Sequence, residues 1–201
     1  SPTNLNVIDY VTIATTGDAQ DFGDLLEALD NVSSCSNSVR GLYGGGGNPS
    51  AVNTIQYITI ASIGDAIDFG DLSAARSFFA SACASSIRGL FGGGNEAPAR
   101  VNTIDYVTIA STGNASDFGD LTVNARDAAG GTASSSTRGL ICIGNSAPNN
   151  NLNTIDFITM ASAGNASDFG DLFTGRYSVS SCSNSNRAVF LGGRTTSPSV
   201  V

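Results

Sequence analysis

The chain has 201 residues, of which 41% are hydrophobic, so it is long enough to bury a sizeable core. Its net charge is −8 and its nine basic residues are all arginines, which argues against the clustered cations that nucleic-acid phosphates require. No apolar run approaches about 18 residues, so no membrane span is predicted. Because the chain lacks histidine, it has no Ser–His or Cys–His catalytic pair, and we expect a protein that is not an enzyme.

A segment that ends in Asp-Phe-Gly-Asp-Leu occurs four times and organises the chain. Its copies begin at Leu5, Val52, Val101 and Leu152. The Asp-Phe-Gly-Asp-Leu motifs begin 47, 49 and 51 residues apart. A period near 50 residues is typical of repeat architectures, in which neighbouring units bury a continuous core between them. We therefore predict a single repeat domain over residues 1–201, made of four units.

Each unit opens with a segment rich in Val, Ile, Thr and Tyr, which are the residues favoured in strands. The predicted strands cover residues 6–13, 54–60, 103–109 and 154–160. In the third unit Ile104 and Tyr106 share one face, while Asp105 and Val107 share the other. Bulky residues on both faces predict that the strand is covered on both sides.

A Gly-Asp or Gly-Asn turn follows this strand, because both pairs tolerate positive φ. The next short strand carries one Phe, which we predict to be a core anchor in every unit: Phe22, Phe69, Phe118 and Phe169. A variable segment and a stretch rich in Ser, Ala and Cys come next, and the small side chains predict close packing.

The unit ends in a strand that begins with Arg-Gly-Leu or a variant of it, at Arg40, Arg88, Arg138 and Arg187. An unpaired charge near a packed core is costly. We therefore expect each of these arginines to pair with an Asp of the repeat or with backbone carbonyls.

Three of the four cysteines occupy one repeat position, five residues before that arginine: Cys35, Cys83 and Cys182. Ala133 stands at this position in the remaining copy, so we interpret it as a small buried apolar slot. Disulfides among these cysteines and Cys142 require closely facing positions, and the sequence leaves their state open. No zinc site is predicted, since the chain has neither His nor a C-x-x-C pair.

Acidic residues concentrate in the repeat turns, which hold ten of the 17 acids. The first two units carry three acids each at a spacing of three: Asp18, Asp21, Asp24, Asp65, Asp68 and Asp71. Ca²⁺ takes six to eight oxygen ligands from loops of this kind, but the spacing is not the EF-hand alternation. We interpret these residues as turn-forming Asp that caps its own backbone. No cofactor is predicted, and calcium is the alternative.

One loop in each unit differs in length and composition, whereas the strands and turns are nearly copied. These loops cover residues 46–51, 94–100 and 145–151, and the terminal segment 194–201 joins them. Variation confined to one set of loops on a constant frame is typical of a binding face. The candidate binding residues are Asn48, Asn95, Glu96, Arg100, Asn145, Asn149, Asn150 and Arg194.

The order of these elements resembles the kelch repeat. Leu90-Phe-Gly-Gly93, Tyr106 and Phe118 carry the resemblance, with Phe where kelch repeats usually have Trp. It implies an all-β, four-bladed β-propeller with the Ser- and Cys-rich stretch as the innermost strand. The chain would begin with strands three and four of a blade and end with strands one and two. The resemblance therefore implies one composite blade, closed by pairing of the N- and C-terminal strands.

The run from Asn102 to Leu121 also looks similar to kelch-like arrays of marine bacteriophage structural proteins. That resemblance implies a structural or appendage protein of a phage particle, found in the virion or outside cells. Its implied partners are other virion or filament subunits and a host cell-surface glycan or protein, contacted through the variable loops. The alternative is an extracellular kelch-like module for protein interaction or for self-assembly into a filament or adhesin.

Overall fold

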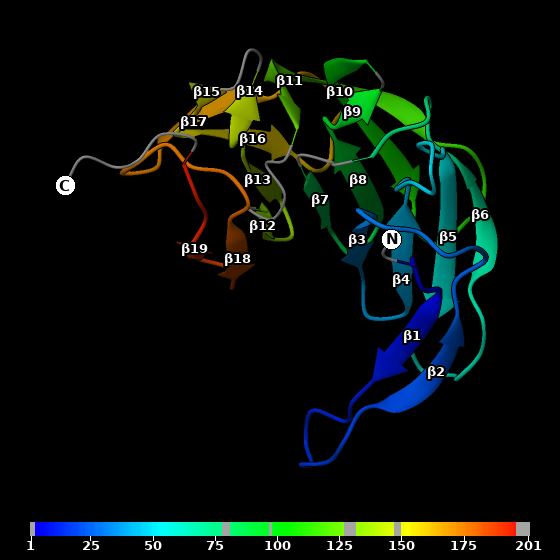
Figure 1. Ribbon diagram of the computed structural model, residues 1–201. Helices are drawn as coiled ribbons and strands as arrows, with labels where there is room; N and C mark the ends of the chain where they lie inside the picture. Colours follow the sequence, from blue (N-terminus) through cyan, green and yellow to red (C-terminus); the bar gives the residue numbers. More distant parts are fainter. Residues whose placement is uncertain (1–2, 78–80, 97, 127–131, 147–149, 196–201) are drawn as a thin grey trace.

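The computed structural model describes residues 3–77, 81–96, 98–126, 132–146 and 150–195. This part of the chain consists of strands and connections without a helix, and its strands pair in antiparallel fashion. The all-β class expected from the sequence is confirmed. Figure 1 shows the sheets side by side along an arc, with the first and the last strand pairs at its two ends.

Three sheets of repeated design form the middle of the arc. Sheet I contains β3 (Ser33–Ser36), β4 (Arg40–Gly44), β5 (Thr54–Thr59) and β6 (Ile67–Asp71). Sheet II contains β7 (Ser81–Ala84), β8 (Arg88–Gly92), β10 (Ala99–Thr108) and β11 (Ser116–Arg126). Sheet III contains β12 (Thr132–Ser134), β13 (Arg138–Cys142), β16 (Thr154–Thr159) and β17 (Ser167–Asp171). In each sheet these four strands pair in chain order.

Two strand pairs flank the three sheets. The N-terminal pair is β1 (Val7–Tyr10) with β2 (Gln20–Asp24), and the C-terminal pair is β18 (Ser180–Ser183) with β19 (Ala188–Leu191). By their sequence, β1 and β2 correspond to the third and fourth strands of a sheet, and β18 and β19 to the first and second. Shorter strands extend the variable loops: β9 (Asn95–Glu96), β14 (Asn145–Ser146) and β15 (Asn150–Asn151).

A β-bulge shifts the register between the third and fourth strands of each sheet, and between β1 and β2. In sheet I the shift lies between Ile55 and Gln56, opposite Gly70, which has φ +142°. A Cβ on Gly70 would lie 2.5 Å from the backbone of Gly113 in the next unit. Glycine is therefore required at the bulge, because only glycine combines this φ with so close an approach of two units.

Neighbouring sheets pack through apolar side chains, and the third strand of sheet II is covered on both sides. Ile104, Asp105 and Val107 are all buried, as predicted for this strand. Of the four Phe anchors, Phe22, Phe69 and Phe118 are 5%, 2% and 2% exposed. The prediction for Phe169 was wrong, since this side chain is 51% exposed. Within the described residues no following unit covers it.

The first strands of the units lie next to one another around a common axis (Figure 1). β3 contacts β7, β7 contacts β12, and β12 contacts β18. Thr132 Oγ1 donates to Ala82 O at 2.8 Å, and Ser181 Oγ donates to Thr132 O at 2.6 Å. The small residues of this stretch allow that approach, which agrees with the close packing expected there.

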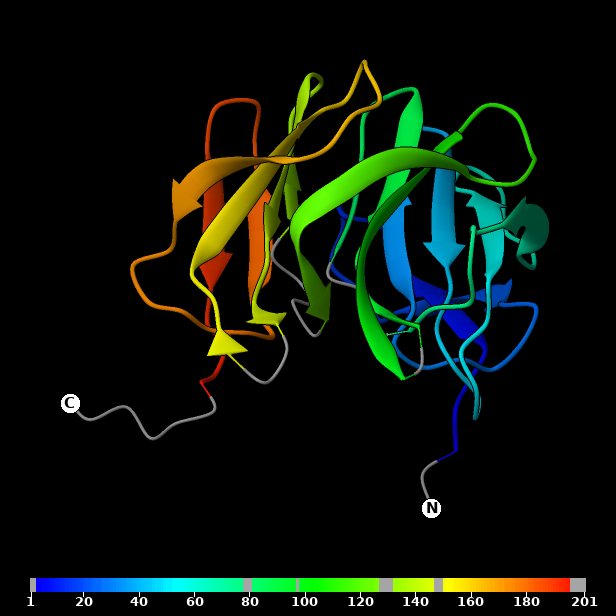
Figure 2. The same ribbon diagram turned by 90° about the horizontal axis from the view of Figure 1, so that it is seen from above.

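The expected pairing of N- and C-terminal strands is not formed in this structure. Among the described strands, β1 pairs with β2 and β19 pairs with β18, in two separate two-stranded sheets. Figures 1 and 2 show the two strand pairs apart from each other. Each pair is held on the sheet beside it along the chain, so the arc stays open between them.

Candidate functional site

The variable loops follow the second strand of each unit and lie on one side of the molecule (Figure 2). Each loop is anchored at its base to the connection that precedes the same unit's first strand. Asn95 N–H donates to Ser77 O at 2.8 Å, and Ser77 N–H donates back to Asn95 O at 3.2 Å. Equivalent backbone pairs join Gly47 to Asp30, Asn145 to Arg126 and Arg194 to Tyr177. The bases of the loops are thus held alike in every unit, while their tips differ.

The structure separates the predicted binding-face residues into exposed and structural ones. Glu96 is exposed beside β10, whereas Asn95 and Arg100 are half-buried. Asn145 is buried, and its Oδ1 accepts a hydrogen bond from Arg100 Nη1 at 3.2 Å. This bond ties the loop of sheet II to the loop of sheet III, so Arg100 and Asn145 stabilise the face instead of offering free groups to a ligand.

Asn48 and Arg194 are exposed but also make contacts inside the chain. Asn48 Nδ2 donates to Ala28 O at 2.8 Å, and the Arg194 guanidinium lies 5.1 Å from the centre of the Tyr177 ring. Asn149 and the side chain of Asn150 lie outside the described residues. The residues that present polar groups outward are therefore Asn48, Glu96 and Arg194.

A buried ion pair lies beneath the loop of sheet II. The Arg76 guanidinium binds the Asp105 carboxylate, and the two side chains are 1% and 0% exposed. Arg76 Nη1 also donates to Thr103 O at 2.9 Å and to Gly93 O at 3.1 Å. Loss of hydration lowers the pKa of Arg76, and the adjacent Asp105 carboxylate opposes that shift. The ion pair thus joins two sheets, because Arg76 lies in the connection after β6 of sheet I and Asp105 lies in β10 of sheet II.

Sequence reasoning missed this ion pair, although the repeats contain a signal for it. The first unit has Leu29 at the position of Arg76, and Gln56 stands at the position of Asp105 in the sheet that follows. Where the cation is replaced by an apolar residue, the acid is replaced by a neutral amide. Gln56 still accepts a backbone hydrogen bond from the preceding connection, since its Oε1 accepts from Leu26 N–H at 2.8 Å.

The prediction for the four repeat arginines is confirmed at two positions. Arg40 Nη1 donates to Ile109 O at 2.7 Å, and Arg88 Nη1 donates to Met160 O at 3.0 Å. In both cases the carbonyl belongs to the following sheet. The Arg138 guanidinium lies 5.3 Å from the centre of the Phe157 ring, and Arg187 is exposed. For these two the structure shows no such carbonyl partner among its described residues.

The acids of the repeat turns serve as acceptors for backbone N–H groups. Asp21 Oδ1 accepts from Gly23 N–H at 3.1 Å, and Asp68 Oδ1 accepts from Gly70 N–H at 3.2 Å. Asp65 Oδ1 accepts from Asp24 N–H of the preceding unit at 3.0 Å. The described part of the chain brings no three metal-ligating side chains together. These bonds agree with the capping interpretation, and calcium binding stays the alternative, which a calcium titration would test.

A cavity of about 210 Å³ lies on the axis between the first strands. Cys35, Cys83 and Cys182 line it together with small residues, and the cysteines are free thiols. Burial raises the pKa of Cys83 to about 12, so this thiol stays protonated at neutral pH. Burial also raises the pKa of Cys35. Both thiols therefore act as small apolar groups, as expected, and are unsuited to nucleophilic chemistry.

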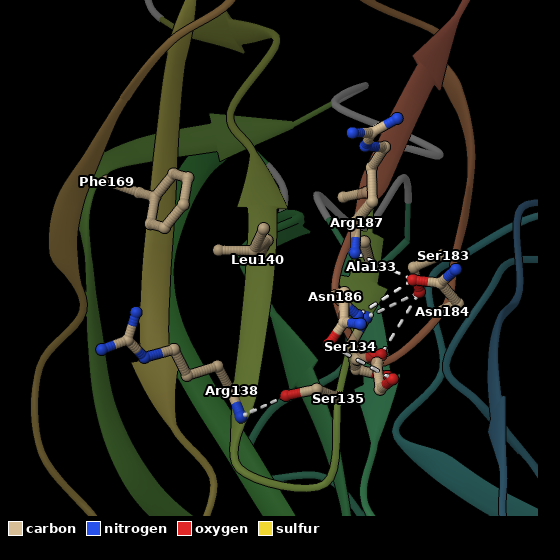
Figure 3. A pocket seen from close by; sticks show the side chains of 12 residues that line it. Ala133, Ser134, Ser135, Arg138, Leu140, Phe169, Ser183, Asn184, Asn186 and Arg187 are labelled. Carbon is tan, nitrogen blue, oxygen red and sulfur yellow. Dashed lines mark hydrogen bonds between the residues drawn. The ribbon is translucent and has the colours of Figure 1, made fainter.

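A second pocket, of about 190 Å³, opens at the C-terminal end of the arc. Figure 3 shows Phe169, Leu140 and Arg138 on one wall, and Asn184, Asn186 and Arg187 on the other. The Asn184 side chain closes this turn, because its Oδ1 accepts from Asn186 N–H and Arg187 N–H, both at 2.9 Å. The pocket lies where another sheet would pack if the repeat continued.

No model of a known protein family matches the chain, and no curated protein matches it. Among the described residues there is no helix with the length and hydropathy that a bilayer crossing requires.

Proposed function

We propose that the chain is a recognition and assembly module without catalytic chemistry, built as a kelch-type four-bladed propeller. In this proposal sheets I to III are three blades, and the two strand pairs are halves of the fourth. One observation supports the proposal above all: the bases of the variable loops are anchored by the same backbone hydrogen bonds in every unit, whereas the loop tips differ. A frame held by identical backbone bonds can vary its ligand contacts without refolding.

The proposed setting is a phage particle, in which the module serves as a structural or appendage protein. The kelch-like resemblance supports this setting, and the small polar surface and net charge of −8 suit an extracellular location. The proposed partners are other virion or filament subunits and a host-surface glycan or protein. The exposed polar groups of Asn48, Glu96 and Arg194 are suited to hydrogen bonding with such partners. Nucleic acid is not a proposed partner, because a net negative chain repels phosphates.

A loop exchange tests the recognition face. Residues 96–99 are replaced by Gly-Ser-Gly-Ser, which leaves Asn95, Arg100 and their structural bonds in place. We expect unchanged cooperative unfolding and at least tenfold weaker binding to host cells or to purified virion proteins. The matched control replaces Ser62 and Ile63, which lie in an exposed turn between the third and fourth strands, by Gly and Ser. Equal binding by the loop variant, the control and the wild type would contradict the proposed face.

The alternative function, a self-assembling extracellular module, is favoured by a different observation. Large apolar side chains are exposed at both ends of the arc, including Ile13 and Phe169. Soluble monomers seldom leave such groups uncovered in clusters.

A further inference from the structure

Inside the chain, each unit is joined to the following unit by the same backbone contacts. Gly113 N–H donates to Phe69 O, and Ala115 N–H donates to Asp71 O, both at 2.7 Å. Asp71 N–H donates to Asn114 Oδ1 at 3.1 Å. The equivalent contacts on either side have distances of 2.6–3.1 Å. The edge at Phe-Gly-Asp of one unit therefore receives the Gly-Asn or Gly-Asp turn of the next.

At the two ends of the arc, both halves of this junction exist but are uncovered. Phe169 is 51% exposed, whereas Phe118 at the equivalent position is 2% exposed. A Cβ on Gly170 would meet nothing within 4 Å. On the N-terminal side Ile13 is 99% exposed, whereas its equivalent Ile109 is 0% exposed. At the C-terminal end the edge at Phe169 therefore lacks the turn of a following unit. At the N-terminal end the turn at residues 16–19 lacks the edge of a preceding unit.

The buried ion pair relates one unit to the next. Arg76 binds Asp105 of the following sheet, and at the preceding junction the sequence has Leu29 and Gln56 at these two positions. The last unit carries Arg176 at the first of these positions, so its successor should carry an acid. The first unit carries Asp9 at the second position, and Asp9 is exposed. The two ends of the chain are therefore complementary in charge.

Arg176 has the contacts expected of a residue whose partner strand is missing. Its Nη2 donates to Phe190 O at 3.3 Å and its Nη1 to Thr174 O at 3.5 Å. Arg76, in contrast, reaches the carboxylate and a carbonyl of β10, the third strand of the following sheet. By comparison with Arg76, Arg176 lacks a neighbouring third strand that carries an acidic side chain.

We propose that the N-terminal strand pair of a second copy of this chain completes the fourth sheet on the C-terminal strand pair of the first. This inference rests on one part of the proposed function, namely that the two terminal strand pairs are halves of a blade, and it is independent of the loop face. The internal sheets define the register, because Leu42 pairs with Tyr57 and Leu90 with Tyr106. By this equivalence Val189 of one copy pairs with Tyr10 of the other, and Phe190 pairs with Asp9.

In this arrangement each uncovered group of the first copy meets a named group of the second. Arg176 reaches the Asp9 carboxylate and the Val7 carbonyl, as Arg76 reaches Asp105 and Thr103. Arg138 donates to the Ile13 carbonyl, as Arg88 donates to that of Met160. Phe169 is covered by the turn at residues 16–19. The pocket of about 190 Å³ beside Phe169 and Leu140 is then closed.

The second copy is favoured over the same chain because both ends are already fixed to their neighbours. The N-terminal pair is held on sheet I by Gly64 N–H to Phe22 O and Ala66 N–H to Asp24 O, both at 2.8 Å. The C-terminal pair is held on sheet III, where Ser181 Oγ donates to Thr132 O. With the arc open between them, closure within one chain requires a change at these packed junctions. A second copy needs none, and a head-to-tail contact of this kind builds rings or filaments.

Charge reversal at each end tests the proposal. Sedimentation velocity on the full chain should show concentration-dependent association of the wild type. Asp9→Arg and Arg176→Asp should each weaken it about a hundredfold, since each places two like charges where the pair would form. Glu27→Arg, an exposed acid after β2, is the matched control and should associate like the wild type. A wild type that stays monomeric at every accessible concentration overturns the proposal.

Mixing the two variants separates a specific contact from loss of fold. For the mixture Arg176→Leu replaces Arg176→Asp, because an acid at this position could pair with the Asp9→Arg substitution of the other copy. The Asp9→Arg copy keeps an intact C-terminal end, and the Arg176→Leu copy keeps an intact N-terminal end. An equimolar mixture should therefore form a one-to-one dimer that does not grow further, measured by light scattering behind a sizing column. If the mixture stays monomeric while both variants unfold cooperatively, the head-to-tail contact is wrong.

A crosslink distinguishes a second copy from closure within one chain. Tyr10→Cys and Val189→Cys are combined with Cys182→Ser, which removes the exposed native thiol. Directly opposed strand residues lie within reach of a disulfide. Oxidation should give dimers and larger species on a denaturing gel, whereas a crosslinked monomer overturns the second copy. The loop variant at residues 96–99 should crosslink normally, so failure of the recognition face and failure of assembly give different results.

Discussion

The buried pair of Arg76 and Asp105 allows a quantitative test of the relation between the repeats. We consider Arg76→Leu, Asp105→Gln and the double variant. The double variant copies the natural Leu29 and Gln56 combination of the preceding junction. Both wild-type side chains are almost inaccessible to solvent. Removing one partner therefore leaves the other charge without compensation in a poorly hydrated site.

The magnitude follows from what each substitution leaves behind. Arg76→Leu leaves the Asp105 carboxylate with Ser73 N–H and Ser73 Oγ as donors, at 3.0 and 2.9 Å, but without a cation. We expect a loss of about 3–5 kcal/mol in the free energy of unfolding, as for other broken buried ion pairs. The double variant retains a neutral acceptor for Ser73 and should lose only about 1–2 kcal/mol, chiefly for the donors to Gly93 O and Thr103 O.

Urea unfolding followed by circular dichroism, with all four proteins at one low concentration, measures these values. The coupling energy between the two sites should be at least about 2 kcal/mol, because the residues touch. A loss under about 1 kcal/mol for Arg76→Leu, or two single losses that simply add in the double variant, would refute the expected coupling between these residues.

Three further predictions concern burial. Phe118→Ala should cost about 3–5 kcal/mol in urea unfolding, whereas Phe169→Ala should cost far less in the monomer, because Phe169 is 51% exposed; equal costs would contradict the open end. A thiol reagent at pH 8 should label exposed Cys182 well before Cys83, whose pKa is raised to about 12 by burial, and equal rates would contradict this. Burial also raises the pKa of Asp156, against the hydrogen bonds from Thr122. The folded state then binds the proton more tightly than the unfolded state, so stability falls as pH rises from about 4 through the raised pKa. Asp156→Asn should remove that part of the pH dependence, and an unchanged profile would count against it.

The sequence by itself determined the repeat, the strand content and most of the core anchors. A period near 50 residues with β-branched segments and Gly-Asn turns leaves few alternatives, since these patterns report local preferences and shared packing. The turn acids were predictable for the same reason, because Asp21 bonds to Gly23 only two residues away.

The tertiary structure decided which repeat positions have neighbours. Phe118 and Phe169 share one motif, yet only the first has a following unit against it. The same difference separates Arg88, which reaches a carbonyl of the next sheet, from Arg187. A local pattern cannot distinguish these positions, because burial depends on residues far away in the chain or in another molecule.

The binding face shows the same division. Its loops were located by their variation, but Asn145 and Arg100 were predicted as contacts and are bonded to each other. The pair of Arg76 and Asp105 was missed, since 29 residues separate its members and neither belongs to a known motif. Such pairs form only when sheets are placed side by side, so packing between units decided them, while local sequence decided the strands that carry them.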